Sequence, residues 1–225
     1  MTRHELLIIM TVGMSTIAGS VMVVYTTMLF PIYGSGLIGH FLSASLISVP
    51  AAIMYANMMI PSNEKTDFPD EKSDDMYSSI MDSITQGTKN GLDIFLNVIA
   101  MLIVVMALVF LVNSVLGLLP NLNGNPITLE LILGYLFAPL AWFMGIPWSE
   151  SIIAGQLLGV KTALNEFVAY LYLSDTENYQ LSEKTRMTLL YALCGFANFS
   201  SVGILLSGLS AMVPERRADL ISVSG

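Results

Sequence analysis

The chain has 225 residues, of which 54% are hydrophobic and only 12% are charged, and its mean hydropathy is +0.70. This composition excludes an ordinary water-soluble domain, because there is too little charge to cover a globule. The 17 acidic and nine basic residues give a formal net charge of -8, which argues against a nucleic-acid partner. A single cysteine excludes a disulfide framework within the chain. Neither a metal-ligand spacing nor a nucleophile with a base partner is apparent, so we expect no catalytic metal, no cofactor and no enzyme.

The N-terminal quarter predicts two membrane crossings. No formally charged residue occurs between Glu5 and Glu64, and a hydrocarbon core about 30 Å thick needs roughly 20 apolar residues to be crossed as a helix. We therefore expect transmembrane helices at about 6–29 and 37–60, joined by a turn rich in glycine.

The middle of the first expected helix carries small and polar residues between Gly13 and Ser20. Close packing against another helix is one explanation for them. The alternative is a break in the helix, where carbonyl and hydroxyl oxygens could bind a hard cation such as sodium.

Residues 61–92 are expected to form an acidic, water-exposed loop. Its last part, from Met76 to Thr88, has apolar residues about four apart and predicts a short amphipathic helix at the membrane interface. Residues 93–119, uncharged after the first, predict a third transmembrane helix. Residues 127–146 predict an interfacial or partly inserted helix, with an N-terminal cap at Thr128 and aromatic rings suited to the headgroup level.

Residues 148–174 predict a re-entrant helical hairpin. Two apolar stretches flank a polar centre with Lys161, Asn165 and Glu166, and each stretch is too short to cross a bilayer alone. Within a membrane, ionisable side chains are tolerated where protein buries them or where they line a wet cavity. We therefore expect two half-helices that present Asn165 and Glu166 to a bound solute. An ordinary surface loop, with the charged side chains in water, is the alternative.

Residues 184–213 predict a broken transmembrane helix, because small and polar residues at 194–201 interrupt an apolar run. Asn198 and Ser201 stand three positions apart, share a face if the backbone stays helical, and suit a hydroxylated solute. Contact between helices through small residues is the alternative. Residues 214–225 are expected to form a tail, whose two arginines favour the cytoplasmic side. The chain is thus expected to be an all-α polytopic membrane protein with transmembrane helices and a re-entrant helical hairpin.

The segment Gly159–Tyr170, GVKTALNEFVAY, resembles the signature of concentrative nucleoside transporters, in which a lysine precedes an Asn-Glu-Phe-Val-Ala run. Segments 16–19, 134–142 and 194–201 support the resemblance, in the order and rough spacing that the family shows. The resemblance covers essentially the whole chain. It implies a multi-pass symporter in the plasma membrane, the inner membrane of bacteria, that moves nucleosides inward as a homotrimer.

The resemblance also implies roles for single residues. The residues matching Glu166, Asn198 and Ser201 hold the ribose hydroxyls in the family. The phenylalanine matching Phe196 packs near the base, and the residue matching Val21 lines the base pocket.

The coupling ion implied by the resemblance is sodium, or the proton in some bacterial members. The residues matching Thr16 and Ile17 help to bind sodium in the family. Cation and nucleoside would then each raise the affinity of the protein for the other, as coupling requires.

The family pattern also includes elements that this sequence lacks. N-terminal helices and a first re-entrant hairpin would precede Met1, and a final helix would follow Arg217. We therefore expect a fragment that does not transport by itself. A subunit of an ion or solute channel, with Glu166 and Lys161 along a permanent path, is the alternative function.

Overall fold

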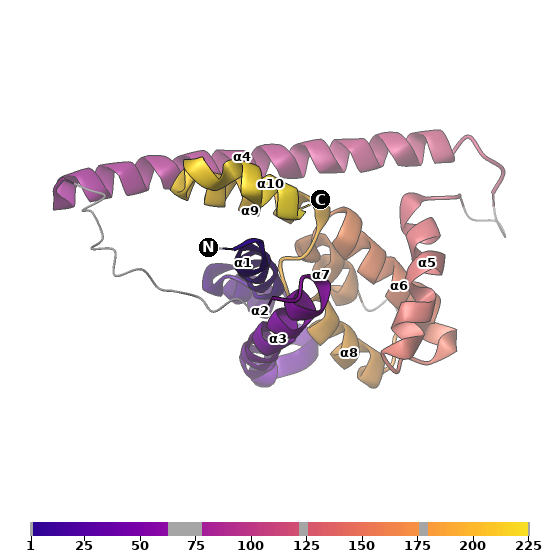
Figure 1. Ribbon diagram of the computed structural model, residues 1–225. Helices are drawn as coiled ribbons and strands as arrows, with labels where there is room; N and C mark the ends of the chain where they lie inside the picture. Colours follow the sequence, from indigo (N-terminus) through magenta and orange to yellow (C-terminus); the bar gives the residue numbers. More distant parts are fainter. Residues whose placement is uncertain (1, 63–77, 122–125, 176–179, 225) are drawn as a thin grey trace.

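The computed structural model describes residues 2–62, 78–121, 126–175 and 180–224, and every regular element in these ranges is a helix (Figure 1). The α-helices and two 3-10 turns are, in chain order, α1 (Arg3–Ser15), α2 (Gly19–Tyr33), η1 (Gly34–Gly36), α3 (Leu37–Met59), α4 (Ile80–Leu116), α5 (Leu129–Phe143), α6 (Trp148–Ala163), α7 (Glu166–Ser174), α8 (Glu183–Leu193), α9 (Phe199–Met212), η2 (Pro214–Arg216) and α10 (Arg217–Ser224). The predicted all-α class is confirmed.

The first predicted span is two helices. The prediction of one continuous helix over 6–29 is wrong, because α1 ends at Ser15 and α2 begins at Gly19. Thr16 and Ala18 have extended backbones. The carbonyl of Thr16 accepts a hydrogen bond of 3.3 Å from the amide of Phe196, a partner distant in sequence, instead of one within a helix. Of the two explanations for the small and polar residues here, the structure shows the break.

Helix α4 replaces two predicted elements. A short amphipathic helix and a separate transmembrane helix were expected on either side of residue 92, and this division is wrong: one helix runs over 37 residues from Ile80 to Leu116. The sequence between these ends contains no proline, so nothing interrupts the ladder of hydrogen bonds. Ser79 caps the start by accepting from the amide of Asp82. Of the predicted acidic loop, residues 63–77 lie outside the described part of the chain.

The expected tail at 214–225 is also largely helical, which corrects that prediction. Leu220 of α10 is buried against Leu6 and Met10 of α1, so the segment gains an apolar partner that its own sequence does not reveal. Helix α10 lies beside α9 and under α4 (Figure 1), and it contacts α1 as well.

Helices α5 and α6 form a tight pair with 119° between their axes. Their backbones approach closely at Gly134, Gly155 and Gly159. A Cβ atom on Gly155 would lie 2.3 Å from the carbonyl oxygen of Gly134 and 2.9 Å from the amide nitrogen of Ala138. Glycine is required there because those obstacles are backbone atoms, which cannot rotate away.

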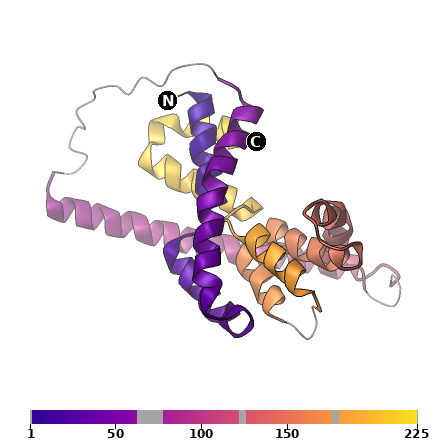
Figure 2. The ribbon, with the colours of Figure 1, turned by 90° about the horizontal axis from the view of Figure 1, so that it is seen from below.

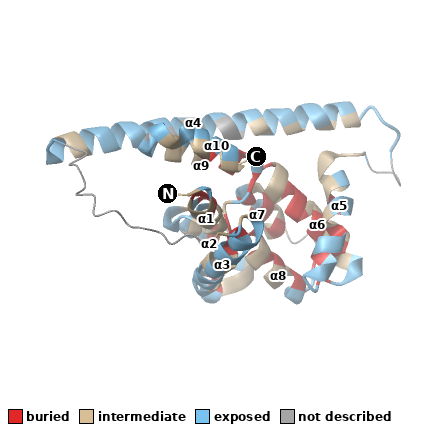
Figure 3. Cartoon of the chain, viewed as in Figure 1, coloured by how far each residue is buried: buried red, intermediate tan, exposed pale blue. Residues whose placement is uncertain are grey.

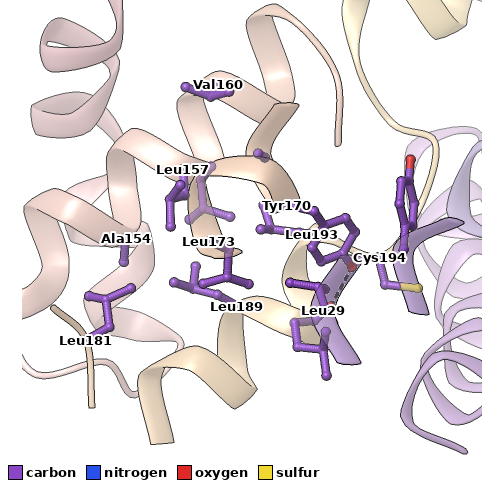
Figure 4. Packing of buried hydrophobic residues seen from close by; sticks show 14 of the residues in the cluster. Leu29, Ala154, Leu157, Val160, Tyr170, Leu173, Leu181, Leu189, Leu193 and Cys194 are labelled. Carbon is purple, nitrogen blue, oxygen red and sulfur yellow. Dashed lines mark hydrogen bonds between the residues drawn. The ribbon is translucent and has the colours of Figure 1, made fainter. Parts of the chain in front are cut away.

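The main core lies where α6, α7 and α8 meet α2 and α3 (Figures 2 and 3). Figure 4 shows Leu157 of α6, Leu173 of α7 and Leu189 of α8 pointing into one shared cluster. Outside it, large apolar side chains are exposed along the helices, as Leu46 of α3 and Phe110 of α4 illustrate. An apolar outer surface of this extent suits a lipid environment.

By length and composition, the helical stretch Arg3–Met59 is apolar enough to cross a membrane, and the bent pair α5 and α6 passes the same criterion when taken together. Shorter apolar helical stretches occur at Ile103–Leu116 and Phe199–Ser210. These apolar helices indicate a helical membrane protein.

Substituting Gly155→Ala tests the close packing of α5 and α6. The added methyl group must push two backbones apart, which should cost about 1–3 kcal/mol of stability. We expect a melting temperature several degrees below wild type, measured by thermal aggregation and size-exclusion chromatography in detergent. Gly91→Ala in α4 is the matched control, because a Cβ there meets no atom within 4 Å. Equal melting temperatures for Gly155→Ala and Gly91→Ala would contradict the packing described.

Candidate functional site

Three helix breaks meet in the middle of the molecule. They separate α1 from α2 at residues 16–18, α6 from α7 at residues 164–165, and α8 from α9 at residues 194–198. The first and third breaks are joined by the bond from the Phe196 amide to the Thr16 carbonyl. The second and third are joined through side chains of Glu166 and Asn198. The three breaks are thus linked by one backbone bond and one bond between side chains.

Two asparagines start the helices that leave these breaks. Asn165 is the N-cap of α7 and accepts from the amide of Val168 at 2.9 Å, while Asn198 is the N-cap of α9 and accepts from the amide of Ser201 at 2.8 Å. Asparagine is among the preferred N-caps because its short side chain reaches an amide that the helix leaves unpaired. Both caps place a helix N-terminus, the positive end of its dipole, at the centre of the molecule.

Glu166 lies at this centre and is 5% exposed. The Tyr25 hydroxyl donates to its Oε1 and the Asn198 amide nitrogen donates to its Oε2, each at 3.0 Å. A carboxylate offers about four lone-pair sites, so one donor on each oxygen leaves acceptor capacity unused. The buried carboxylate is therefore held firmly and can still accept hydrogen bonds from a solute.

A cavity of about 410 Å³ opens beside the carboxylate. Its wall is formed by α2, the start of α7, the third break and α9, through Ser20, Val21, Val24, Tyr25, Asn165, Glu166, Phe167, Phe196, Ser200 and Ile204. A mostly apolar pocket of a few hundred Å³ with a few convergent polar groups is typical of a small-molecule site.

Four of the predicted substrate-binding residues line this cavity: Val21, Asn165, Glu166 and Phe196. The Nδ2 atom of Asn165 donates to no atom of the described residues and is available to a solute.

Asn198 and Ser201 lie behind the cavity wall. Asn198 is 4% exposed and holds Glu166, and Ser201 is fully buried. The Ser201 hydroxyl has no hydrogen-bond partner within the described ranges. The structure thus brings Glu166, Asn198 and Ser201 together, as the sequence predicted, while their contact with a sugar stays a prediction.

Thr16 and Ile17, the predicted sodium ligands, lie at the first break. Ile17 packs against the core, and the Thr16 carbonyl is bonded to Phe196. Among the described residues no group of three His, Cys, Asp or Glu side chains could hold a metal ion, so a cation here would depend on carbonyl and hydroxyl oxygens. Sodium binding at Thr16 and Ile17 stays a prediction.

Sequence reasoning missed Tyr25 and Ser200. Tyr25 directly follows the apolar run 21–24 of α2, and a hydroxyl buried there requires a partner. That requirement was a usable signal, although the partner, Glu166, stands 141 residues away. Ser200 donates to Asn198 Oδ1 at 2.6 Å, so it orients the amide that in turn donates to Glu166.

Lys161 also connects the second break to the third, through a hydrogen bond of its side chain. Its Nζ donates to the carbonyl of Ala192 near the end of α8 at 2.9 Å. A cation near a helix C-terminus is favourable because the last carbonyls carry partial negative charge. Lys161 is therefore partly buried and held by a protein carbonyl, and Glu166 is buried, contrary to the alternative of a surface loop with its charges in water.

Gly195 allows the third break to approach the first. Its φ is 124°, which favours glycine, and a Cβ there would lie 2.9 Å from the carbonyl oxygen of Ser15. The local sequence of the third break, Cys194 to Asn198, thus suits the point where this break crosses the first break.

Discontinuous helices whose termini converge on a buried polar site are typical of helical secondary transporters. Residues 40–225 match the profile of the family described as Na+ dependent nucleoside transporter C-terminus. The chain belongs to this nucleoside transporter family.

Relatives from bacteria and animals match nearly the whole chain. It is 40% identical to the uncharacterized transporter YutK of Bacillus subtilis, over 98% of this chain and 54% of YutK. It is 38% identical to the nucleoside permease NupC of Helicobacter pylori, over 98% of this chain and 52% of NupC. Human solute carrier family 28 member 3 is 35% identical over 98% of this chain and 34% of the carrier. The chain thus spans about half the length of its bacterial relatives.

Comparison with solved structures leads to the same kind of relative as comparison of sequences. The structure of CNTnw in an inward-facing substrate-bound state superimposes with a TM-score of 0.79 and 37% identity, over 100% of this chain and 52% of that one. A variant of CNTnw in an outward-facing state gives a TM-score of 0.80 and 36% identity. The confirmed features are therefore the family, the helical membrane fold and the relation to transporters rather than to enzymes.

Asn198→Ala tests the double role of this cap. The substitution removes an N-cap, which should cost about 0.5–2 kcal/mol. It also leaves Glu166 Oε2 without its donor, for a further cost of about 1–3 kcal/mol. Thr128→Ala is the control, because the Thr128 side chain caps α5 by accepting from the amide of Leu131 and does not line the cavity. We expect Asn198→Ala to lower the melting temperature clearly more than Thr128→Ala; equal losses would show that the Asn198–Glu166 bond contributes nothing.

Proposed function

We propose that this chain provides the ribose-binding part of a nucleoside symporter that is driven by a cation gradient, with sodium as the favoured cation. The observation that carries the proposal is Glu166, a buried carboxylate on the wall of a cavity, held by one donor on each oxygen and able to accept more. Family membership and relatives named as a nucleoside permease and a sodium/nucleoside cotransporter support the choice of solute.

The chemistry of the cavity suits a nucleoside. Ribose hydroxyls donate hydrogen bonds, and bonds to a charged acceptor in a site of low dielectric are about twice as strong as neutral ones. Asn165 Nδ2 offers a donor to a sugar or base oxygen. The unpaired hydroxyl of Ser201, behind the cavity wall, can bond to a ribose hydroxyl that reaches it. The apolar wall, with Val21 and the ring of Phe196, suits the flat face of a base.

The first break supports cation coupling. Thr16 and Ile17 are proposed to contribute oxygen ligands to sodium, and the bond between Phe196 and Thr16 ties that position to the nucleoside cavity. A cation that orders the break would therefore also order the cavity wall. Linkage then requires that the nucleoside raise the affinity for the cation by the same factor. A proton remains the alternative coupling ion of the proposal.

The proposed setting is a multi-pass protein of the bacterial inner membrane that works as a homotrimer. The channel alternative is not favoured, because the matched relatives are named as transporters, permeases and solute carriers. In the structure Glu166 and Lys161 are each held by a specific hydrogen-bond partner.

Glu166→Gln tests the proposed carboxylate. The substitution keeps the shape of the side chain but removes its charge and one acceptor, so we expect the Kd for labelled uridine to rise about 10- to 100-fold. Binding is measured by scintillation proximity with the full chain in lipid nanodiscs. Glu183→Gln, at an exposed position of α8 outside the cavity wall, is the control and should bind as wild type does. Wild-type binding that is absent, or unchanged in Glu166→Gln, would refute the proposal.

Replacing sodium by choline at constant pH tests the coupling ion. We expect the uridine Kd to rise at least about fivefold without sodium, the lower end of common coupling energies. The same titration at a lower pH, with choline throughout, tests the proton alternative. A Kd that responds to neither sodium nor pH would contradict cation coupling at this site.

A further inference from the structure

We infer that Tyr25 is a specificity-determining residue, whose phenol and the Glu166 carboxylate together form a paired acceptor for the two neighbouring hydroxyls of a ribose. This inference rests on the proposed function, because it assigns a second contact within the same nucleoside site. Tyr25 lies on the cavity wall and donates to Glu166 Oε1 at 3.0 Å.

The direction of this hydrogen bond determines what Tyr25 can offer to a solute. A phenol has one proton, and the carboxylate of Glu166 can only accept, so that proton is used in their mutual bond. The phenol oxygen then keeps acceptor capacity and has no donor left. Asn198 donates to the other carboxylate oxygen, Oε2. Around Oε1, the remaining acceptor capacity is therefore that of the Glu166 carboxylate and that of the Tyr25 phenol oxygen.

Two acceptors joined by one hydrogen bond of 3.0 Å match two adjacent donors. The 2′ and 3′ hydroxyls of a ribose are attached to neighbouring carbons, and both can donate. One hydroxyl would donate to Glu166 and the other to the phenol oxygen of Tyr25. A deoxy sugar would leave one buried acceptor unpaired, which is the arrangement that discriminates most strongly against an analogue lacking a hydroxyl.

The ring of Tyr25 is rigidly placed for this role. Tyr25 is only 1% exposed. Its ring centroid lies 4.8 Å from that of Tyr170 and 6.2 Å from that of Phe41, in the range of favourable aromatic pairs. The phenol oxygen therefore needs little ordering when a sugar arrives, which favours both affinity and discrimination.

Tyr170 supplies a matched control within the same aromatic cluster. It is fully buried, and its hydroxyl donates to the carbonyl of Leu190 at 2.8 Å. It does not line the cavity or bond to Glu166. Tyr170→Phe thus removes a buried hydroxyl bond of similar length beside Tyr25 without changing the acceptors that face the cavity.

The test measures the Kd values of uridine, 2′-deoxyuridine and 3′-deoxyuridine for wild type, Tyr25→Phe and Tyr170→Phe, with the full chain in nanodiscs. Tyr25→Phe should weaken uridine binding about 5- to 30-fold, the effect of one lost hydrogen bond. One of the two deoxy analogues, the one that lacks the hydroxyl facing Tyr25, should lose less affinity than uridine does when Tyr25→Phe replaces wild type, because only uridine loses a direct contact. Tyr170→Phe should keep the wild-type ratios among the three ligands.

The outcomes separate this inference from the proposed function. If Glu166→Gln loses uridine binding while Tyr25→Phe weakens all three ligands by one common factor, Tyr25 acts only as a support and the inference is overturned, but the proposed function stands. The inference is also overturned if Tyr170→Phe changes the ratios as much as Tyr25→Phe does. If wild type binds no uridine, or Glu166→Gln binds it normally, the proposed function fails as well.

Discussion

The structure depends on keeping one carboxylate, that of Glu166, inside a helical membrane protein. Transfer of an unpaired carboxylate to an apolar interior is very costly, so donors must meet it from other parts of the chain. They come from α2 through Tyr25 and from the break between α8 and α9 through Asn198. Segments at positions 25, 166 and 198 are thereby joined at one point.

The helix breaks follow from the same requirement. A continuous helix satisfies its own backbone and presents only side chains, whereas a broken helix also presents its amides and carbonyls. Here α7 and α9 point their N-termini toward the cavity and are capped by Asn165 and Asn198. The C-terminal end of α8 is met instead by Lys161. Donors and positive helix ends thus gather around the acceptor that the cavity exposes.

Much of this arrangement could be predicted from the sequence, because membranes make polar residues informative. Lys161, Asn165 and Glu166 within an apolar context predicted a break, and α6 and α7 are separated there. Asn198, in the polar interruption of the last apolar run, was for a similar reason predicted to be a second polar group at the solute site. The break at Thr16 was left open between two explanations, since the same small residues serve both close packing and helix interruption.

Other features depend on tertiary partners that local patterns do not show. The continuity of α4 follows from the absence of a breaker, but the charge pattern around residue 92 suggested a boundary. Helix α10 forms over a supposed tail because α1 covers Leu220. Tyr25 was missed because hydropathy counts a tyrosine as part of an apolar run, although its hydroxyl carries the interaction that matters.

The most direct measurement is an experimental structure of the full chain in lipid with uridine bound. The account predicts ribose hydroxyl oxygens at hydrogen-bond distance, about 2.6–3.2 Å, from the Glu166 carboxylate, with Asn198 still donating to its other oxygen. It would be contradicted by a nucleoside bound elsewhere, or by a Glu166 side chain that faces bulk water away from Asn198.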